Sequence, residues 1–298
     1  MKIATTTTAS IYYGRANWQN LLRFIHPYLL KAKRYGILDD YYVQFSRHRG
    51  DHIRLITKSS TEQGYTNSQG ILYKVISKFI HNNPSENKAQ IFPVKGFFMD
   101  YPNNSVWINH NRVHNQENAA QSKEQIGMQM QISAAFIAAF EQEEMTLENI
   151  CTFVVYLQLG MLKAFNPTIQ QASMAATELL NWEKKQSTSA DDDRIDQTDA
   201  GDFFQQMLEE NHSSLVDIIL ETWELEGLTN PLQWTKTWEK ACGKFIGNSD
   251  YPNGFFDICG MIYGQINFIS VLSLPLISLK LIAKILSDMK HTALKVHQ

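Results

Sequence analysis

One short stretch of the sequence concentrates side chains that could do chemistry. Residues 47–54, Arg-His-Arg-Gly-Asp-His-Ile-Arg, hold three arginines and two histidines. A guanidinium group binds a carboxylate through paired hydrogen bonds, and an imidazole can gain or lose a proton near neutral pH. These residue types predict a pocket for an anion. The alternative that stays open is a basic hairpin tip in solvent, because structural charge clusters resemble functional ones.

The residues around this stretch predict how its side chains are placed. Residues 41–46 and 52–57 are rich in aromatic and β-branched residues, which favour strands, and residues 49–51 have the composition of a turn. Side chains two positions apart in a strand share a face of the sheet. We therefore expect His52 and Arg54 to point the same way, opposite the apolar residues between and after them.

The wider pattern predicts an α+β fold. Strands are expected at 10–13, 41–46, 52–57 and 90–99, and helices at 17–33 and 70–81. The order over residues 1–100 is β-α-β-β-α-β, which is the ferredoxin-like order. Pro27 lies inside the first helix, so we expect that helix to be kinked or divided. A loop is expected from Pro102 to about Asn115.

The C-terminal portion, residues 118–298, is expected to be mostly helical. Helices are predicted at 118–143, 147–165, 168–185, 201–227, 231–246 and 255–288, the last broken near Pro275. Residues 186–200 are polar and acidic and predict a flexible loop. The whole chain, 1–298, is expected to form a single compact domain from the small α/β portion and the helical portion.

Composition excludes several classes of protein. The chain has 27 Lys and Arg against 30 Asp and Glu, so a general nucleic-acid binder is disfavoured. No nucleotide-binding or zinc-protease motif is present, and the three cysteines lack zinc-ligand spacing, so neither a cofactor nor a metal is expected. Residues 258–279 carry no charge, but polar residues and Pro275 interrupt them, so no membrane span is expected. With no signal peptide and free thiols, a cytoplasmic protein is expected.

Three motifs in the first 60 residues occur in a recognisable order. Residues 12–15 read Tyr-Tyr-Gly-Arg, residues 45–47 read Phe-Ser-Arg, and residues 52–55 read His-Ile-Arg-Leu. In this order they resemble the start of the lantibiotic dehydratase C-terminal domain, which performs glutamate elimination. That family also includes stand-alone thiopeptide-type bacteriocin biosynthesis proteins.

The resemblance implies a lyase of ribosomal peptide natural-product biosynthesis. A glutamyl-tRNA-dependent dehydratase would place glutamate on Ser or Thr of a precursor peptide, and this chain would eliminate the glutamate to leave a dehydroamino acid. Arg15, Arg47 and Arg54 would bind the departing glutamate and the enolate-like charge. His52 would orient these cations or carry a proton. Direct contact with nucleic acid is not implied.

The C-terminal part of the resemblance leaves alternatives open. Tyr263 stands where the family has a catalytic histidine, and a tyrosine with a pKa near ~10 is a poor base. Further substrate contacts are expected from Arg49, Tyr101, Gln265 and Asn267. The alternative functions are a pyridine-forming [4+2] cyclase of thiopeptide type, a non-catalytic precursor-binding subunit of a split dehydratase, and an unrelated protein of the same architecture. The apolar 118–140 helix leaves a homodimer open.

Overall fold

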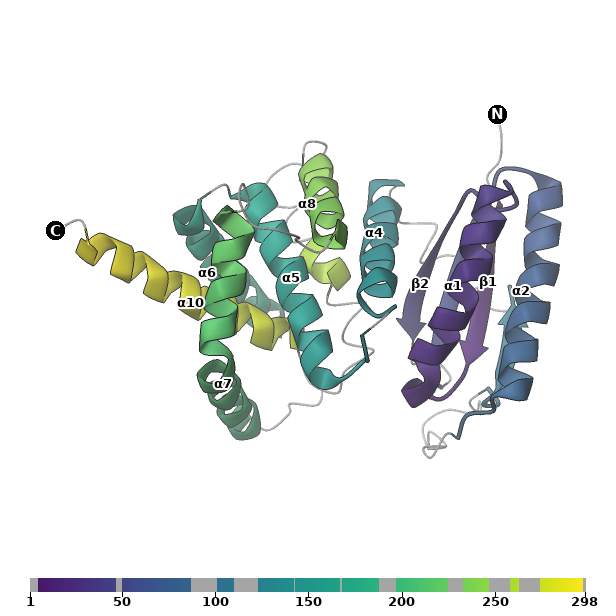
Figure 1. The fold of residues 1–298 in the computed structure, drawn as a ribbon, viewed down its shortest axis with the longest axis horizontal. Helices are drawn as coiled ribbons and strands as arrows, with labels where there is room; N and C mark the ends of the chain where they lie inside the picture. Colours follow the sequence, from purple (N-terminus) through teal and green to yellow (C-terminus); the bar gives the residue numbers. More distant parts are fainter. Residues whose placement is uncertain are drawn as a thin grey trace. The chain divides into compact units, whose positions relative to one another are not determined.

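The computed structural model describes most of the chain. The described residues are 5–46, 50–86, 101–109, 123–141, 143–166, 168–187, 197–224, 233–246, 258–262 and 274–296. Contacts group the chain into two compact units, residues 1–145 and 146–298 (Figure 1). Strands and helices are both present, so the predicted α+β class is confirmed. The predicted organisation of the chain as a single domain stays a prediction.

The first unit is built on a four-stranded antiparallel sheet. Its strands are β1 (Thr5–Tyr12), β2 (Asp40–Ser46), β3 (His52–Ser59) and β4 (Ser105–Ile108), in the spatial order β2-β3-β1-β4. Helix α1 (Trp18–Arg34) connects β1 to β2, and α2 (Glu62–Asn82) follows β3. The β-α-β-β-α-β order is therefore observed, as the sequence pattern predicted.

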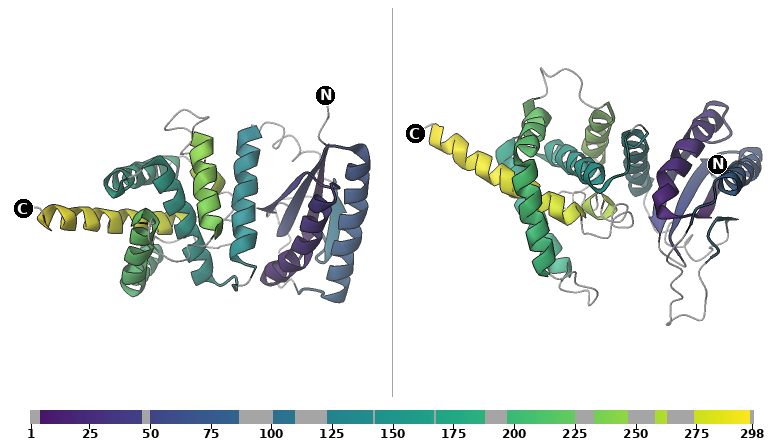
Figure 2. Two further views of the ribbon diagram at one scale, coloured as in Figure 1. Left: turned by 45° about the horizontal axis from the view of Figure 1, so that its top comes forward. Right: turned by 60° about the horizontal axis from the view of Figure 1, so that its bottom comes forward.

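Helices α1 and α2 pack against each other and cover one face of the sheet (Figure 2). On this face the apolar side chains of the two central strands, Ile11, Ile53 and Leu55, are completely buried. The Trp18 ring of α1 stacks on Phe45 of β2, with 5.0 Å between the ring centroids. Burial of such large apolar side chains is the main favourable contribution to folding of this unit.

The fourth strand lies where the sequence analysis expected a loop. The predicted strand at 90–99 falls outside the described residues, and β4 occupies 105–108 instead. Asn104 and Asn109, at the two ends of β4, both adopt positive φ, which Asn tolerates better than most residues. A loop was predicted here because residues 102–104 are turn formers. That prediction gave too little weight to residues 106–108, Val-Trp-Ile, which are strong strand formers.

The helices of this unit also differ from expectation. The sequence predicted that α1 would be kinked or divided at Pro27. Helix α1 runs through Pro27 as one continuous helix, so the division is wrong, and the kink stays a prediction. Helix α2 begins at Glu62, well before the predicted start at 70, because the Thr61 side chain caps it by accepting the Gly64 N–H at 3.0 Å. This cap offsets the weak helix propensity of the Gly and Ser residues in the first half of α2.

Helix α4 (Lys123–Ala139) packs along β2, so it belongs to the first unit and not with the later helices. The backbone N–H of Val43 donates to Ser133 Oγ at 2.9 Å, and Gln44 Nε2 donates to Gln129 Oε1 at 3.1 Å. A helix therefore covers the outer edge of β2, which would otherwise expose unpaired backbone groups.

The second unit is helical over its described residues. Its long helices are α5 (Leu147–Phe165), α6 (Ile169–Ser187), α7 (Gln197–Glu224), α8 (Gln233–Ile246) and α10 (Leu274–Val296). Helix α5 contacts the other four, as expected for an almost wholly apolar helix. Trp238 of α8 donates to the Leu157 carbonyl at 2.7 Å, and its ring is so close to Gly160 that a Cβ there would lie 2.8 Å from it.

Two expectations for the second unit concern its connections. A flexible loop was predicted at 186–200. Its two ends are helical instead, because α6 ends at Ser187 and α7 begins at Gln197. Residues 188–196 lie outside the described residues. Pro275 lies in the first turn of α10, a position where its missing N–H costs nothing. Among the described residues no helix is long and apolar enough to cross a membrane.

Candidate functional site

The structure describes part of the predicted site. Arg15, His52, Arg54 and Tyr101 lie in described residues, all of them in the first unit. The remaining candidates lie outside the described residues: Arg47, Arg49, Tyr263, Gln265 and Asn267.

His52 and Arg54 lie on the face of β3 opposite to the α1–α2 layer. In the register of the sheet, Ser10 of β1 and Gln44 of β2 are the neighbours of Arg54. Tyr12 occupies the corresponding position beside His52. His52 is completely buried and Arg54 is 7% exposed, so neither belongs to a hairpin tip in solvent. A buried guanidinium beside hydroxyl and amide groups can bind a negative charge strongly, because little water screens it.

Aromatic rings cover His52. The Tyr12 ring stacks on the His52 ring with centroids 4.5 Å apart, and Tyr101 packs on Tyr12 with centroids 4.8 Å apart. Trp107 of β4 completes the row, 5.0 Å from Tyr101. Tyr101, predicted as a substrate contact, is therefore separated from the predicted catalytic histidine by a single ring, that of Tyr12.

One hydrogen bond sets the protonation pattern of His52. Its Nδ1 lies 2.9 Å from the Gly50 carbonyl oxygen, which can only accept. In the neutral ring Nδ1 therefore carries the hydrogen, and Nε2 carries the lone pair. Gly50 has a φ of 104°, a conformation that favours glycine, so the turn that supplies this carbonyl suits glycine at position 50.

Arg15 lies near this cluster but is already paired. Its Nε donates to Asp51 Oδ2 at 2.5 Å and its Nη2 donates to Asp51 Oδ1 at 2.8 Å, a bidentate ion pair. The two side chains are 29% and 34% exposed. The pair joins the short 3-10 turn Arg15–Asn17, which precedes α1, to the turn that precedes His52. Arg15 therefore holds this turn, a role that the sequence analysis did not assign to it.

A polar network fixes the loop that carries Tyr101. The Gly14 N–H donates to Ser85 Oγ at 2.8 Å, and Asn103 Nδ2 donates to the Ser85 carbonyl at 2.7 Å. The Ser85 N–H donates to Asn104 Oδ1 at 2.8 Å. A Cβ on Gly14 would lie 3.0 Å from the Glu86 carbonyl oxygen, so a larger residue there would have to displace this backbone slightly. Sequence reasoning missed these residues, although the Asn103-Asn104 pair signals a structured turn.

Arg54 also influences the ionisation of a neighbour. Burial raises the pKa of Tyr42 on β2, and the positive charge of Arg54 partly opposes that rise. The two residues lie on the same face of the sheet, since the cross-strand partner of Tyr42 is Ile56, two residues after Arg54. The positive charge of Arg54 thus acts across this face of the sheet. We call it the polar face, because it carries Ser10, Gln44, His52 and Arg54.

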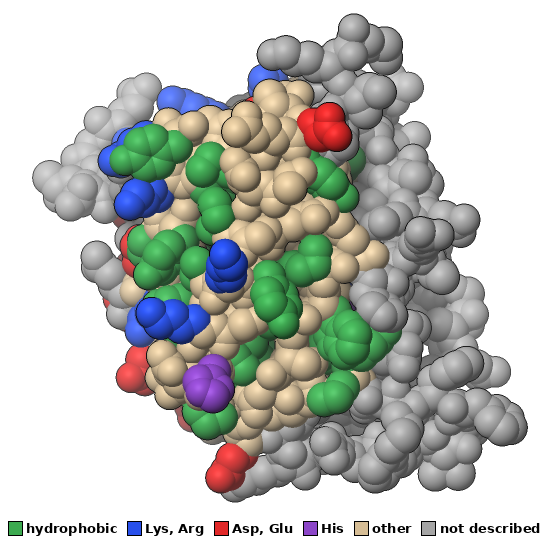
Figure 3. Space-filling view, turned by 90° about the vertical axis from the view of Figure 1, so that its right-hand side faces the viewer, with side chains coloured by type: hydrophobic (Ala, Val, Ile, Leu, Met, Phe, Trp, Pro, Cys, Tyr) green, Lys and Arg blue, Asp and Glu red, His purple; other side chains and the backbone are tan. Residues whose placement is uncertain are grey.

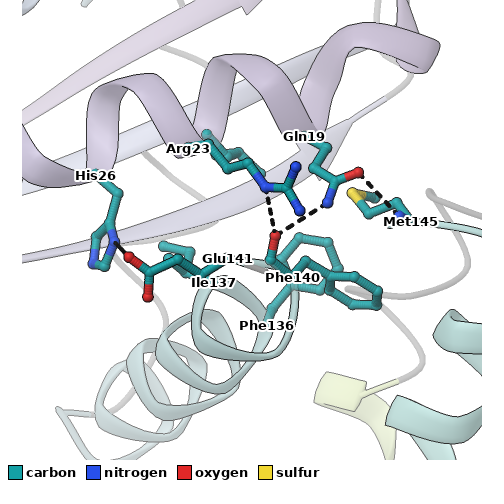
Figure 4. Close-up of a pocket in the computed structure, with 9 residues that line it drawn as sticks. Gln19, Arg23, His26, Phe136, Ile137, Phe140, Glu141 and Met145 are labelled. Atoms are coloured by element: carbon teal, nitrogen blue, oxygen red, sulfur yellow. Dashed lines mark hydrogen bonds and ion pairs between the residues drawn. The ribbon is translucent and has the colours of Figure 1, made fainter. Parts of the chain in front are cut away.

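A second cluster of basic side chains, Arg23 and His26, lies between α1 and α4 (Figure 4). Arg23 donates to the backbone carbonyls of Phe140 and Glu143 at 3.1 and 2.8 Å, and Gln19 Oε1 accepts the Met145 N–H at 3.0 Å. These bonds satisfy backbone groups of Phe140, Glu143 and Met145, which follow the C-terminal end of α4. The cavity beside them holds about 10 Å³, barely enough for one water, so this cluster is a structural clamp.

The clamp also contains a titratable pair. His26 Nδ1 lies 4.0 Å from Glu141 Oε1. Burial lowers the pKa of His26, and the nearby Glu141 carboxylate opposes this effect. His26 therefore favours its neutral form more strongly than a histidine in solvent.

Other reactive groups have structural surroundings. Cys151, Cys242 and Cys259 are buried and unbridged, and burial raises the pKa values of Cys151 and Cys242. A thiol with a raised pKa is a poor nucleophile at neutral pH. Within the described part of the chain, no group of His, Cys, Asp and Glu side chains is arranged to hold a metal ion.

Comparisons with known proteins give a fold but no sequence family. No protein-family model and no curated protein matches the sequence. A structure of the pyridine synthase TbtD from thiomuracin biosynthesis superposes with a TM-score of 0.66 at 12% identity, covering 95% of this chain and 98% of that one. The structure of TsrL superposes with a TM-score of 0.58 at 11% identity, over 96% and 95% of the two chains.

A larger enzyme contains the same fold as one part. The tRNA-dependent lantibiotic dehydratase MibB from Microbispora sp. 107891 superposes with a TM-score of 0.55 at 10% identity, over 97% of this chain and 28% of that chain. The chain therefore shares its fold with thiopeptide and lantibiotic biosynthesis proteins, the group that the first 60 residues resemble.

Proposed function

We propose that the protein is a lyase of ribosomal peptide natural-product biosynthesis, which eliminates glutamate from glutamylated Ser or Thr of a precursor peptide. The observation that carries this proposal is the buried Arg54 beside His52 on the polar face of the sheet. The motifs that contain these residues resemble the elimination domain, and the fold is shared with a tRNA-dependent lantibiotic dehydratase.

The proposed reaction needs a proton acceptor and a cation. A base removes the Cα proton, the electron pair forms the Cα=Cβ double bond, and the Cβ–O bond breaks. Glutamate leaves with the bonding electrons as a carboxylate. We assign Arg54 to the negative charge that develops on the enolate or the leaving carboxylate. We assign His52, with its lone pair at Nε2, to the proton.

The burial of His52 adds a condition to this mechanism. Its ring is fully covered, with Tyr12 stacked on it and Tyr101 on Tyr12. Because His52 is completely buried, the substrate can reach Nε2 directly only if groups that cover the ring move. Tyr263 and the other candidates outside the described residues keep their proposed roles from the resemblance. The proposed partners are the precursor peptide and a glutamyl-tRNA-dependent dehydratase, which would place the reaction in the cytoplasm.

One experiment separates this function from its alternatives. Purified protein is incubated with a precursor peptide glutamylated on Ser and, in parallel, with the same peptide already dehydrated. We expect mass spectrometry to show loss of glutamate from the first peptide and no change in the second. Glutamylated peptide that persists in full would contradict the proposal.

A second candidate is the pyridine-forming [4+2] cyclase. Asp51 neutralises Arg15, which leaves fewer cations for glutamate, and the superposition on a pyridine synthase covers almost all of both chains. This candidate predicts the reverse outcome. The dehydrated peptide would be cyclised, with release of its leader segment, and the glutamylated peptide would stay unchanged. Binding of both peptides without reaction would instead favour a non-catalytic subunit.

A further inference from the structure

The outer edge of β4 presents backbone hydrogen-bonding groups away from the sheet. The Asn109 N–H donates to the Thr8 carbonyl at 2.8 Å, which marks this cross-strand position as a hydrogen-bonded one. In an antiparallel pair such positions alternate along the strand. Counting back from Asn109, Trp107 is the next hydrogen-bonded position, and its backbone groups face β1. The N–H and C=O groups of Val106 and Ile108 therefore point outward, away from β1.

The opposite edge of the sheet confirms this alternation. When the same alternation is followed across the sheet from β1 through β3 to β2, it predicts that the Val43 N–H points away from the sheet at the outer edge of β2. That N–H does point outward, where Ser133 Oγ of α4 accepts it at 2.9 Å. No corresponding hydrogen bond to the outward groups of Val106 or Ile108 occurs among the described residues. Within the described part of the chain, a helix covers one edge, whereas the outward groups of the other edge are left to bond an added strand.

A groove runs beside this open edge, between β4 and the second half of α2. Its volume is about 810 Å³, and α2 contributes Tyr73, Ser77, Ile80 and His81 to its lining, together with Pro84. Val106 and Ile108 also line it, with side chains on the face that α2 covers. A strand added to β4 would place alternate side chains against this mostly apolar lining.

Two lysines lie on α2 next to lining residues of the groove, since Lys74 is three positions before Ser77 and Lys78 is three positions before His81. Lys74 and Lys78 are exposed on α2, one turn apart, and the exposed His81 follows them at the next turn. The sequence contains no acidic residue between Tyr73 and Asn83. Figure 3, which views this side of the molecule, shows hydrophobic side chains, basic side chains and a histidine on this surface, with acidic side chains towards its edges. This charge favours a peptide that carries acidic residues.

We propose that the outer edge of β4 binds an extended, acidic and apolar segment of the precursor peptide by strand addition. Backbone hydrogen bonds to Val106 and Ile108 supply affinity, the groove takes alternate apolar side chains, and Lys74 and Lys78 bind acidic ones. Identifying this peptide as the precursor rests on the proposed function. The docking surface itself rests on the open edge and the groove.

The test measures binding of a fluorescently labelled, unmodified precursor peptide to the full chain by anisotropy. Val106→Pro removes an outward N–H without removing a hydrogen bond to β1, and we expect it to weaken binding about tenfold. Lys74→Glu with Lys78→Glu should weaken binding and reduce its dependence on salt. The matched control is Lys236→Glu with Lys240→Glu, a pair at the same spacing on α8, which should leave binding unchanged.

The binding outcomes test the docking surface, and a separate activity assay tests the proposed function. Unchanged binding in both variants, with thermal unfolding showing that they are folded, would overturn the docking surface. A concentration-dependent dimer that Val106→Pro abolishes would also overturn it, because the edge would then pair with a second copy. Elimination on a short glutamylated peptide that lacks the acidic segment tests the lyase alone, since that substrate does not need the groove.

Discussion

Two clusters of basic side chains in the first unit, each with an arginine and a histidine, have opposite surroundings. In the clamp between α1 and α4, Arg23 donates to two backbone carbonyls at a helix end, and His26 lies against Glu141. On the polar face of the sheet, Arg54 and His52 are buried among hydroxyl, amide and aromatic side chains of neighbouring strands. The first cluster joins two helices, whereas the second forms one continuous polar face.

The difference shows that the presence of cations is a weak sign of function. The clamp leaves a cavity of about 10 Å³, and its carbonyl partners are fixed parts of the backbone. The polar face places a guanidinium on a rigid sheet, where it can act on a charge that develops in a substrate. Substitutions should therefore affect stability in the clamp and catalysis on the polar face.

The largest effect is expected at Arg54. Arg54→Gln should lower the rate of glutamate elimination by about 100-fold or more, because it removes the cation proposed to stabilise the developing charge. Thermal unfolding should change little, since loss of a buried charge is offset by the desolvation that it no longer requires. A variant that is fully active would remove Arg54 from the mechanism.

The matched substitution in the clamp is Arg23→Gln. It removes charge-assisted hydrogen bonds to the Phe140 and Glu143 carbonyls, so we expect a loss of about 1–3 kcal/mol in the free energy of unfolding. Urea unfolding measures this loss, and the elimination rate below the unfolding temperature should stay near that of wild type. A strong loss of rate with unchanged stability would reverse the roles of the two clusters.

A smaller effect is expected for the pair that holds the turn before His52. Arg15→Gln and Asp51→Asn each break a partly exposed ion pair, whose coupling energy should be about 0.2–1 kcal/mol. The elimination rate should fall less than tenfold in either variant. The double variant should lose little more than each single one, which a double-mutant cycle measures. Additive losses would mean that Arg15 contacts the substrate independently of Asp51.

The smallest effect is the pH dependence that His26 gives to stability. Burial lowers the pKa of His26 in the folded protein, so the unfolded chain binds a proton more readily. Its contribution to stability is therefore complete above the unfolded pKa of about 6.5 and is lost as the pH falls towards the folded value. His26→Gln should flatten the slope of unfolding free energy against pH below 6.5, whereas an unchanged slope would assign it to other groups.

Local patterns predicted much of the first unit. Aromatic and β-branched residues correctly marked β2 and β3, and period-two alternation placed His52 and Arg54 on one face. The same reasoning missed β4, since its strong strand formers occupy four residues between turn signals. It also underestimated β1, which extends back through a run of threonines to Thr5.

Contacts between distant residues were beyond the reach of these patterns. Asp51 pairs with Arg15 across 36 positions, and the Ser85 network brings Tyr101 beside Tyr12 through hydrogen bonds to Asn103 and Asn104. Neither contact follows from spacing within a strand or a helix. The packing of α4 on β2 is of the same kind, because a Ser133 hydroxyl on an apolar helix gives no sign that it will meet the Val43 N–H.

The most direct test of the proposed chemistry counts two products of one reaction. A precursor peptide glutamylated on Ser and deuterated at Cα is incubated with the wild-type protein, and free glutamate and dehydroalanine are both quantified. We predict equal amounts of the two, loss of the Cα deuterium, and formation of both products about 100-fold or more slowly with Arg54→Gln. Intact glutamylated peptide, or free glutamate with serine regenerated, would contradict it.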